Sequence, residues 1–110
     1  MPKALVGTWD RTMTGAAWKK NHVTGEPAGV YSVVISSDGT ATLEFDATPF
    51  THMPAAASGT VLKLGATADE VCARPATYAW SVSGRTLTLH LKKDDCDPRR
   101  GLFSGPLKRK

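Results

Sequence analysis

The 110-residue sequence has no long hydrophobic run. No apolar stretch approaches the roughly 18 residues that a membrane-spanning helix requires, so we expect no membrane insertion. The first residues, Met1-Pro2-Lys3, lack the features of a signal peptide. As it stands, the sequence predicts a cytoplasmic protein, or an exported one from which a signal has been removed, and the compartment stays open.

The sequence also lacks the motifs of common enzymes and nucleic-acid-binding proteins. There is no Gly-X-Ser-X-Gly, no zinc-ligand spacing and no phosphate-cradling glycine loop. Asp94, Asp95 and Asp97 concentrate oxygen ligands, but no histidine or glycine pattern of a metal loop accompanies them. We therefore predict neither a metal nor a cofactor. The net charge of +4 comes without a platform of aromatic and basic residues, which argues against nucleic-acid binding.

Cysteine is scarce: Cys72 and Cys96 are the only two. They flank the two clearest predicted strands, so a disulfide between neighbouring segments fits their placement, and we favour it. The alternative is a pair of buried free thiols in a reducing compartment.

What the sequence does contain is apolar–polar alternation, which is typical of β-strands. Residues 29–36 and 40–46 flank Ser37-Asp38-Gly39 and predict one hairpin; residues 77–82 and 85–92 flank Ser83-Gly84 and predict another. Further strand patterns occupy residues 3–12, 50–52, 60–64 and 102–109, and residues 54–59 read as a flexible connection.

Two short helical patterns interrupt the strands. Thr14 can cap a helix that Trp18 would anchor, just after the first strand. Asp97-Pro98 reads as the cap and first residue of a single helical turn ending at Gly101. With seven or eight short strands and no βαβ alternation, the sequence predicts one all-β domain over residues 1–110. We expect a small antiparallel up-and-down barrel with one short helix after the first strand.

The ordered motifs resemble a known family. Leu5-Val6-Gly7-Thr8-Trp9 is similar to the first-strand Gly-X-Trp of lipocalins and the wider calycin group. Cys72, Tyr78-X-Trp80, Gly84-X-X-Leu87-Thr88-Leu89, Asp95-Cys96 and Arg99-Arg100 resemble small lipocalin-like proteins of actinobacteria. The resemblance implies a barrel that binds small hydrophobic molecules. It also implies a late basic residue packed over Trp9, for which Arg99, Arg100 and Arg109 are the candidates.

The candidate ligand-binding residues share an inward position or a place at the barrel rim. We predict that they are Tyr31, Val33, Leu43, Phe45, His52, Tyr78, Trp80 and Leu89. The competing interpretation is a filled core made by the same apolar side chains. Arg11 lies on the same face as Trp9, and we expect strand bending to leave it exposed.

Three functions remain open. The first is binding of a small hydrophobic or aromatic molecule by a monomer or weak homodimer. The second is an enzyme of specialised metabolism, a cyclase or isomerase, with Tyr78 or His52 as proton donor. The third is a filled barrel that acts through its outer surface.

Overall fold

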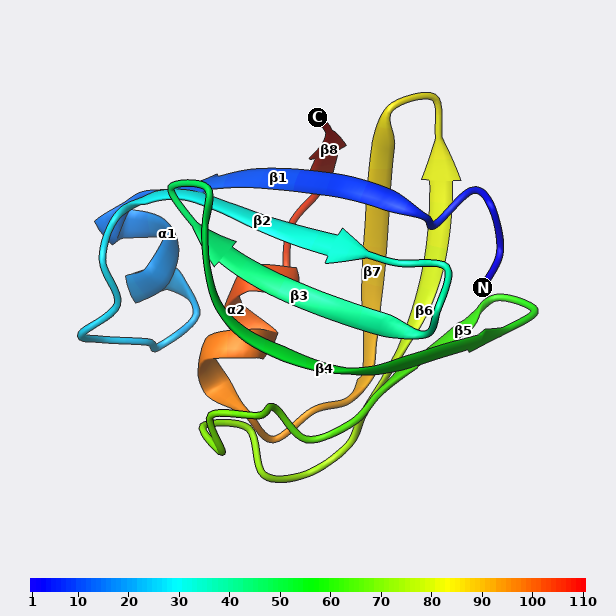
Figure 1. Cartoon of the computed structure of the whole chain (residues 1–110). Coiled ribbons are helices and arrows are strands. Elements are labelled where there is room, and N and C mark those ends of the chain that lie inside the picture. Colours follow the sequence, from blue (N-terminus) through cyan, green and yellow to red (C-terminus); the bar gives the residue numbers. More distant parts are fainter.

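The computed structural model describes all 110 residues as a closed barrel of eight antiparallel strands, which confirms the predicted fold class (Figure 1). Each strand pairs with its neighbours in sequence, and the last strand pairs with the first. The strands are β1 Gly7–Met13, β2 Gly29–Ile35, β3 Thr40–Phe45, β4 Thr48–Ser58, β5 Val61–Leu64, β6 Ala76–Ser83, β7 Thr86–Lys93 and β8 Leu107–Arg109. Closure leaves no long unpaired strand edge.

The two ends of the barrel differ. The N-terminal residues and the turns β2–β3 and β4–β5 gather at one end, at the right of Figure 1, and the β6–β7 turn, drawn above them, belongs to the same end. We call this end the floor. Helices α1 (Gly15–Lys20) and α2 (Asp97–Phe103) lie at the opposite end, the mouth. No helix is both long and apolar enough to span a bilayer.

Trp9 lies in the floor, fully buried. Its indole N–H donates to the Leu5 carbonyl at 2.9 Å, and the Arg109 guanidinium lies 4.2 Å above the ring centre. Arg109 also donates to the carbonyls of Val6 and Ala4. Of the three candidate arginines, Arg109 therefore covers the tryptophan. Gly7, at φ 142°, makes room for it, since a Cβ there would meet the Arg109 side chain at 2.5 Å.

Helix α1 forms as predicted. The Thr14 hydroxyl accepts the Ala17 N–H at 3.0 Å, and Trp18 is the buried residue of the helix. Its indole packs edge-on to the ring of Tyr31, with centroids 5.4 Å apart. Packing of Trp18 against the barrel thus stabilises a six-residue helix that is too short to be stable alone.

Helix α2 is longer than predicted. It continues through Gly101 to Phe103, and β8 begins only at Leu107, so the expected strand over residues 102–109 is wrong in its first half. Gly101 is a contact point here instead of a helix stop: a Cβ there would lie 3.1 Å from the Trp18 ring. The N-cap is Cys96, so the capping position predicted for Asp97 is also wrong.

Arg11 corrects a further expectation. Its side chain is half-buried, and Nη1 donates to the carbonyls of Gly101 and Leu102 at 3.1 and 2.8 Å. A cation thus satisfies the free carbonyls at the end of α2, where the helix dipole favours positive charge.

Strand β4 continues without a break from Thr48 to Ser58. The flexible connection expected over residues 54–59 is therefore wrong, apart from the turn that begins at Gly59. Thr51, Met53 and Ala55 are buried, and the residues between them are exposed. Small alanines gave this alternation little hydrophobic contrast in the sequence. Pro54 pairs with Thr40 within the strand, and its carbonyl accepts the Gly65 N–H.

Candidate functional site

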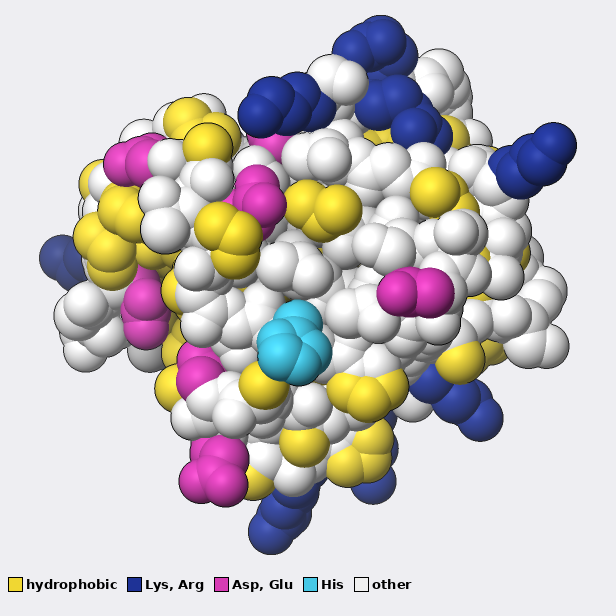
Figure 2. All heavy atoms as spheres, viewed as in Figure 1, with side chains coloured by type: hydrophobic (Ala, Val, Ile, Leu, Met, Phe, Trp, Pro, Cys, Tyr) yellow, Lys and Arg dark blue, Asp and Glu magenta, His cyan; other side chains and the backbone are white.

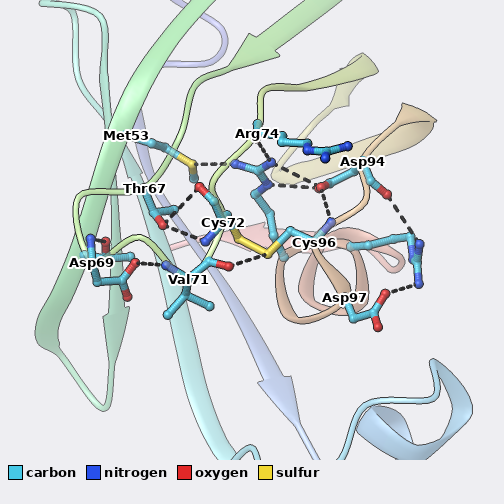
Figure 3. Close-up of a disulfide and its surroundings, with 12 residues drawn as sticks. Met53, Thr67, Asp69, Val71, Cys72, Arg74, Asp94, Cys96 and Asp97 are labelled. Carbon is cyan, nitrogen blue, oxygen red and sulfur yellow. Dashed lines mark hydrogen bonds and ion pairs between the residues drawn. A yellow bond between two sulfur atoms is a disulfide. The ribbon is translucent and has the colours of Figure 1, made fainter.

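The mouth of the barrel is held by a disulfide. Cys72, in the segment between β5 and β6, is bonded to Cys96 at the start of α2, which confirms the favoured pairing. Within that segment, the Thr67 hydroxyl accepts the Cys72 N–H at 2.9 Å, and the Asp69 carboxylate accepts the Val71 N–H at 3.1 Å (Figure 3). The segment is thereby fixed against α2.

A buried ion pair lies behind the disulfide. Arg99 on α2 donates through Nε to Asp94 at 2.9 Å, and neither side chain has exposed surface. The Tyr78 hydroxyl also donates to Asp94. Burial and this hydrogen bond raise the pKa of Tyr78 far above its ordinary value, so the phenol is neutral.

A pocket of about 180 Å³ opens at the mouth. Its walls come from α1, β2, β3, β4, the segment between β5 and β6, and α2. The apolar lining includes Trp18, Tyr31, Leu43, Phe50, Val71 and Leu102, together with Cys72 and Pro98. Two acidic residues, Glu26 and Asp69, also line it.

Two apolar side chains of this pocket are unusually exposed. Phe50 is 47% exposed and Val71 is 63% exposed, and both belong to the rim. Exposed large apolar groups around a concave site are typical of ligand-binding surfaces.

Two residues of the pocket lining, Tyr31 and Asp69, have shifted pKa values. Burial, followed by the carboxylates of Glu26 and Asp46, raises the pKa of Tyr31. Burial also acts to raise the pKa of Asp69, but hydrogen bonds from Thr67, Val71 and Thr51 outweigh it, and the net pKa is lowered. Asp69 is therefore ionised at neutral pH.

The structure brings only two of the predicted binding residues, Tyr31 and Leu43, to the pocket. Phe45 packs against Tyr31 with centroids 4.9 Å apart but is not part of the lining. Val33, Tyr78 and Leu89 are buried in the core.

The two remaining predicted residues lie elsewhere. Trp80 is partly buried on the floor half of β6, and its indole nitrogen is buried without a hydrogen-bond partner. The side chain of His52 is exposed on the outer face of β4. The structure therefore separates the rim histidine from the inward aromatic residues that the sequence grouped with it.

Sequence reasoning missed most of the pocket wall. In the sequence, Trp18 indicates only a helix anchor, Phe50 lies in a weak strand pattern, and Asp69 and Val71 fall in a stretch without a strand or helix pattern. The available signal is the disulfide, because a bridge from Cys72 to Cys96 holds the segment that carries Cys72 against the helix after β7.

No protein-family model, curated protein or solved structure matches this chain.

Proposed function

We propose that this protein binds a small hydrophobic or aromatic molecule at the mouth of its barrel. The observation that carries the proposal is the apolar pocket whose rim exposes Phe50 and Val71. Covering these side chains with a ligand removes apolar surface from water, at about 25 cal/mol per Å².

The pocket volume limits the ligand. A pocket of about 180 Å³ is below the roughly 300–1,000 Å³ of drug-sized sites and close to the roughly 150 Å³ cavity that accommodates benzene. Below the pocket, the barrel is packed with its own side chains, including Trp9, Tyr78 and Leu87. The ligand is thus a compact body of one or two rings at the mouth, and a long chain threading the barrel is not expected.

The barrel itself supports a lipocalin-like assignment. A closed eight-stranded sheet, a first-strand Gly-X-Trp and a late arginine over the tryptophan together fit the family that the sequence resembles. We propose that the chain is a small lipocalin-like protein of the type found in actinobacteria. Binding of small hydrophobic molecules is what that assignment implies.

Binding without a reaction is the function we put forward. The two proton donors considered for a cyclase or isomerase lie outside the pocket. Tyr78 donates to Asp94 in the core, and His52 is exposed on the outer face of β4. No observation favours the enzyme over the binder.

Calorimetric titration with neutral aromatics tests the proposal. We expect tryptophol, 2-naphthol or 2-phenylethanol to bind, and Phe50→Ala to weaken binding about fivefold, the effect of losing roughly 1 kcal/mol of apolar contact. Leu91→Ala is the matched control, because Leu91 is 53% exposed and does not line the pocket. If none of the three compounds binds at millimolar concentration, or if both variants lose affinity equally, the proposal is wrong.

A further inference from the structure

We propose that the pocket selects a cation, so that its ligand is a protonated amine carried on a small aromatic body. This inference rests on the proposed binding function and adds the charge of the ligand. Its basis is the set of hydrogen-bonding groups at the mouth, which offers acceptors and almost no free strong donors.

The donors of the aromatic wall are already used. The Trp18 indole N–H donates to the Pro27 carbonyl at 3.2 Å, and the Tyr31 hydroxyl donates to the same carbonyl at 2.7 Å. Both residues line the pocket, and the segment between α1 and β2 accepts the polar hydrogens of both rings. A ligand carboxylate or phosphate would find no hydrogen bond from them.

Arg99 is the one cation in the lining, and it too is fully engaged. Its Nε and Nη2 donate to Asp94, Nη2 also donates to the Arg74 carbonyl, and Nη1 donates to the Gly65 carbonyl and the Met53 sulfur. These contacts use all five guanidinium N–H groups. Asp94 neutralises its charge inside the protein, so Arg99 does not attract an anion.

Two carboxylates at the rim have no such partner. The ion pairs of the structure are Arg74–Asp95, Arg99–Asp94 and Arg100–Asp97, and neither Glu26 nor Asp69 belongs to one. In the view of Figure 2, acidic and apolar side chains mingle on the left, where α1 lies in Figure 1, whereas most Lys and Arg side chains lie at the periphery. A ligand cation would supply the missing counter-charge.

The aromatic rings favour the same charge. The ring of Tyr31 packs edge-to-face with the rings of Trp18 and Phe50, with centroid distances of 5.4 and 6.4 Å, and Phe50, which is 47% exposed, presents the accessible aromatic surface. A cation over an aromatic face gains roughly 0.5–1 kcal/mol at an exposed site, and an exposed ion pair gains about 0.2–1 kcal/mol. Together these effects predict about a tenfold preference for an amine over a neutral ligand of the same shape.

Three ligands that share an indole test the preference: tryptamine, which is cationic at neutral pH, the neutral tryptophol, and the anionic indole-3-acetate. Calorimetry at low salt should give dissociation constants that rise in that order, with tryptamine about tenfold tighter than tryptophol. High salt should reduce the advantage of tryptamine and leave tryptophol unchanged, because screening acts on charges alone.

Variants assign the preference to its residues. Glu26→Gln with Asp69→Asn should abolish the preference of the pocket for tryptamine over tryptophol, and asparagine at position 69 can still accept the Val71 N–H. Asp38→Asn is the matched control. Its carboxylate likewise accepts the N–H two residues ahead, at 3.1 Å, but lies in the β2–β3 turn on the floor end.

The outcomes are distinguishable. Equal binding of the three ligands overturns the charge selectivity and leaves the binding function standing. No binding of any ligand overturns both. A preference that survives the double variant, or that Asp38→Asn also removes, overturns the assignment to Glu26 and Asp69.

Discussion

Trp9 and Trp80 are both inward-facing tryptophans, but only Trp9 has an acceptor for its indole N–H. Trp9 is fully buried and donates to the Leu5 carbonyl, while the Trp80 nitrogen is buried without a partner. An unpaired buried donor costs about 1–3 kcal/mol. The indole N–H therefore contributes a hydrogen bond to the fold at Trp9 and costs stability at Trp80.

Replacement of each tryptophan by phenylalanine should expose this difference. Trp9→Phe removes a satisfied hydrogen bond and leaves both a void and an unpaired Leu5 carbonyl, so we expect a loss of about 2–3 kcal/mol. Trp80→Phe leaves a void but removes the unpaired N–H, and the free energy of unfolding should change by less than about 1 kcal/mol. Urea titration measures both. Equal losses in the free energy of unfolding of the two variants would contradict the predicted difference.

At the scale of elements, the segment between β5 and β6 is held to α2 by a disulfide and by hydrogen bonds from Arg99 to the Gly65 and Arg74 carbonyls. The disulfide joins residues 24 positions apart, and it fixes the stretch that carries Asp69 and Val71. Without it, the segment would rely on the Arg99 hydrogen bonds near its two ends and on internal hydrogen bonds such as those of Thr67 and Asp69.

Cys72→Ser with Cys96→Ser should lower the free energy of unfolding by about 3.5 kcal/mol, the loop-entropy value for a closure of this length. The measurement is urea unfolding of the oxidised protein and the double variant. Reduced wild-type protein is the control and should unfold like the variant. Two alkylatable thiols in the native oxidised protein, or a double variant as stable as wild type, would contradict the bridge.

The elements also show where sequence reasoning works. The β2–β3 and β6–β7 hairpins were predictable because large apolar residues alternate around glycine turns. Helix α1 was predictable from its cap and single anchor. Strand β4 was predicted only in part because its alternation continues through alanines, and α2 was cut short because Gly101 looks like a helix stop until the ring of Trp18 lies against it.

The candidate site was less predictable than the barrel, for a physical reason. Alternation shows that a side chain points inward but not at which height of the barrel it lies. Tyr31 and Leu43 lie high enough to line the mouth, whereas Trp80 lies toward the floor and Tyr78 is bound to Asp94 in the core. The rest of the wall comes from irregular segments, whose position depends on the disulfide and on contacts between distant parts of the chain.

At the scale of the whole molecule, the Tyr78 hydroxyl couples global stability to alkaline pH. Tyr78, Asp94 and Arg99 join β6 to α2 in the core, so only unfolding that opens the barrel exposes the phenol. The pKa of Tyr78 is raised in the folded protein, whereas an unfolded tyrosine titrates near pH 10. Its contribution to stability is fully present below about pH 10 and is lost as the pH rises above it, because only the unfolded state then releases the proton.

We therefore expect the free energy of unfolding to fall with rising pH above about pH 10, and Tyr78→Phe to remove part of that fall. Between pH 9 and pH 11 the variant should lose about 1 kcal/mol less than wild type, even if it is less stable at neutral pH because it lacks the hydrogen bond to Asp94. Urea titrations at several pH values measure the slope. Trp80→Phe is the control, since it keeps every titratable group and should retain the wild-type slope. An unchanged slope in Tyr78→Phe would mean that the phenol titrates in the folded barrel, and that the core around Asp94 opens without global unfolding.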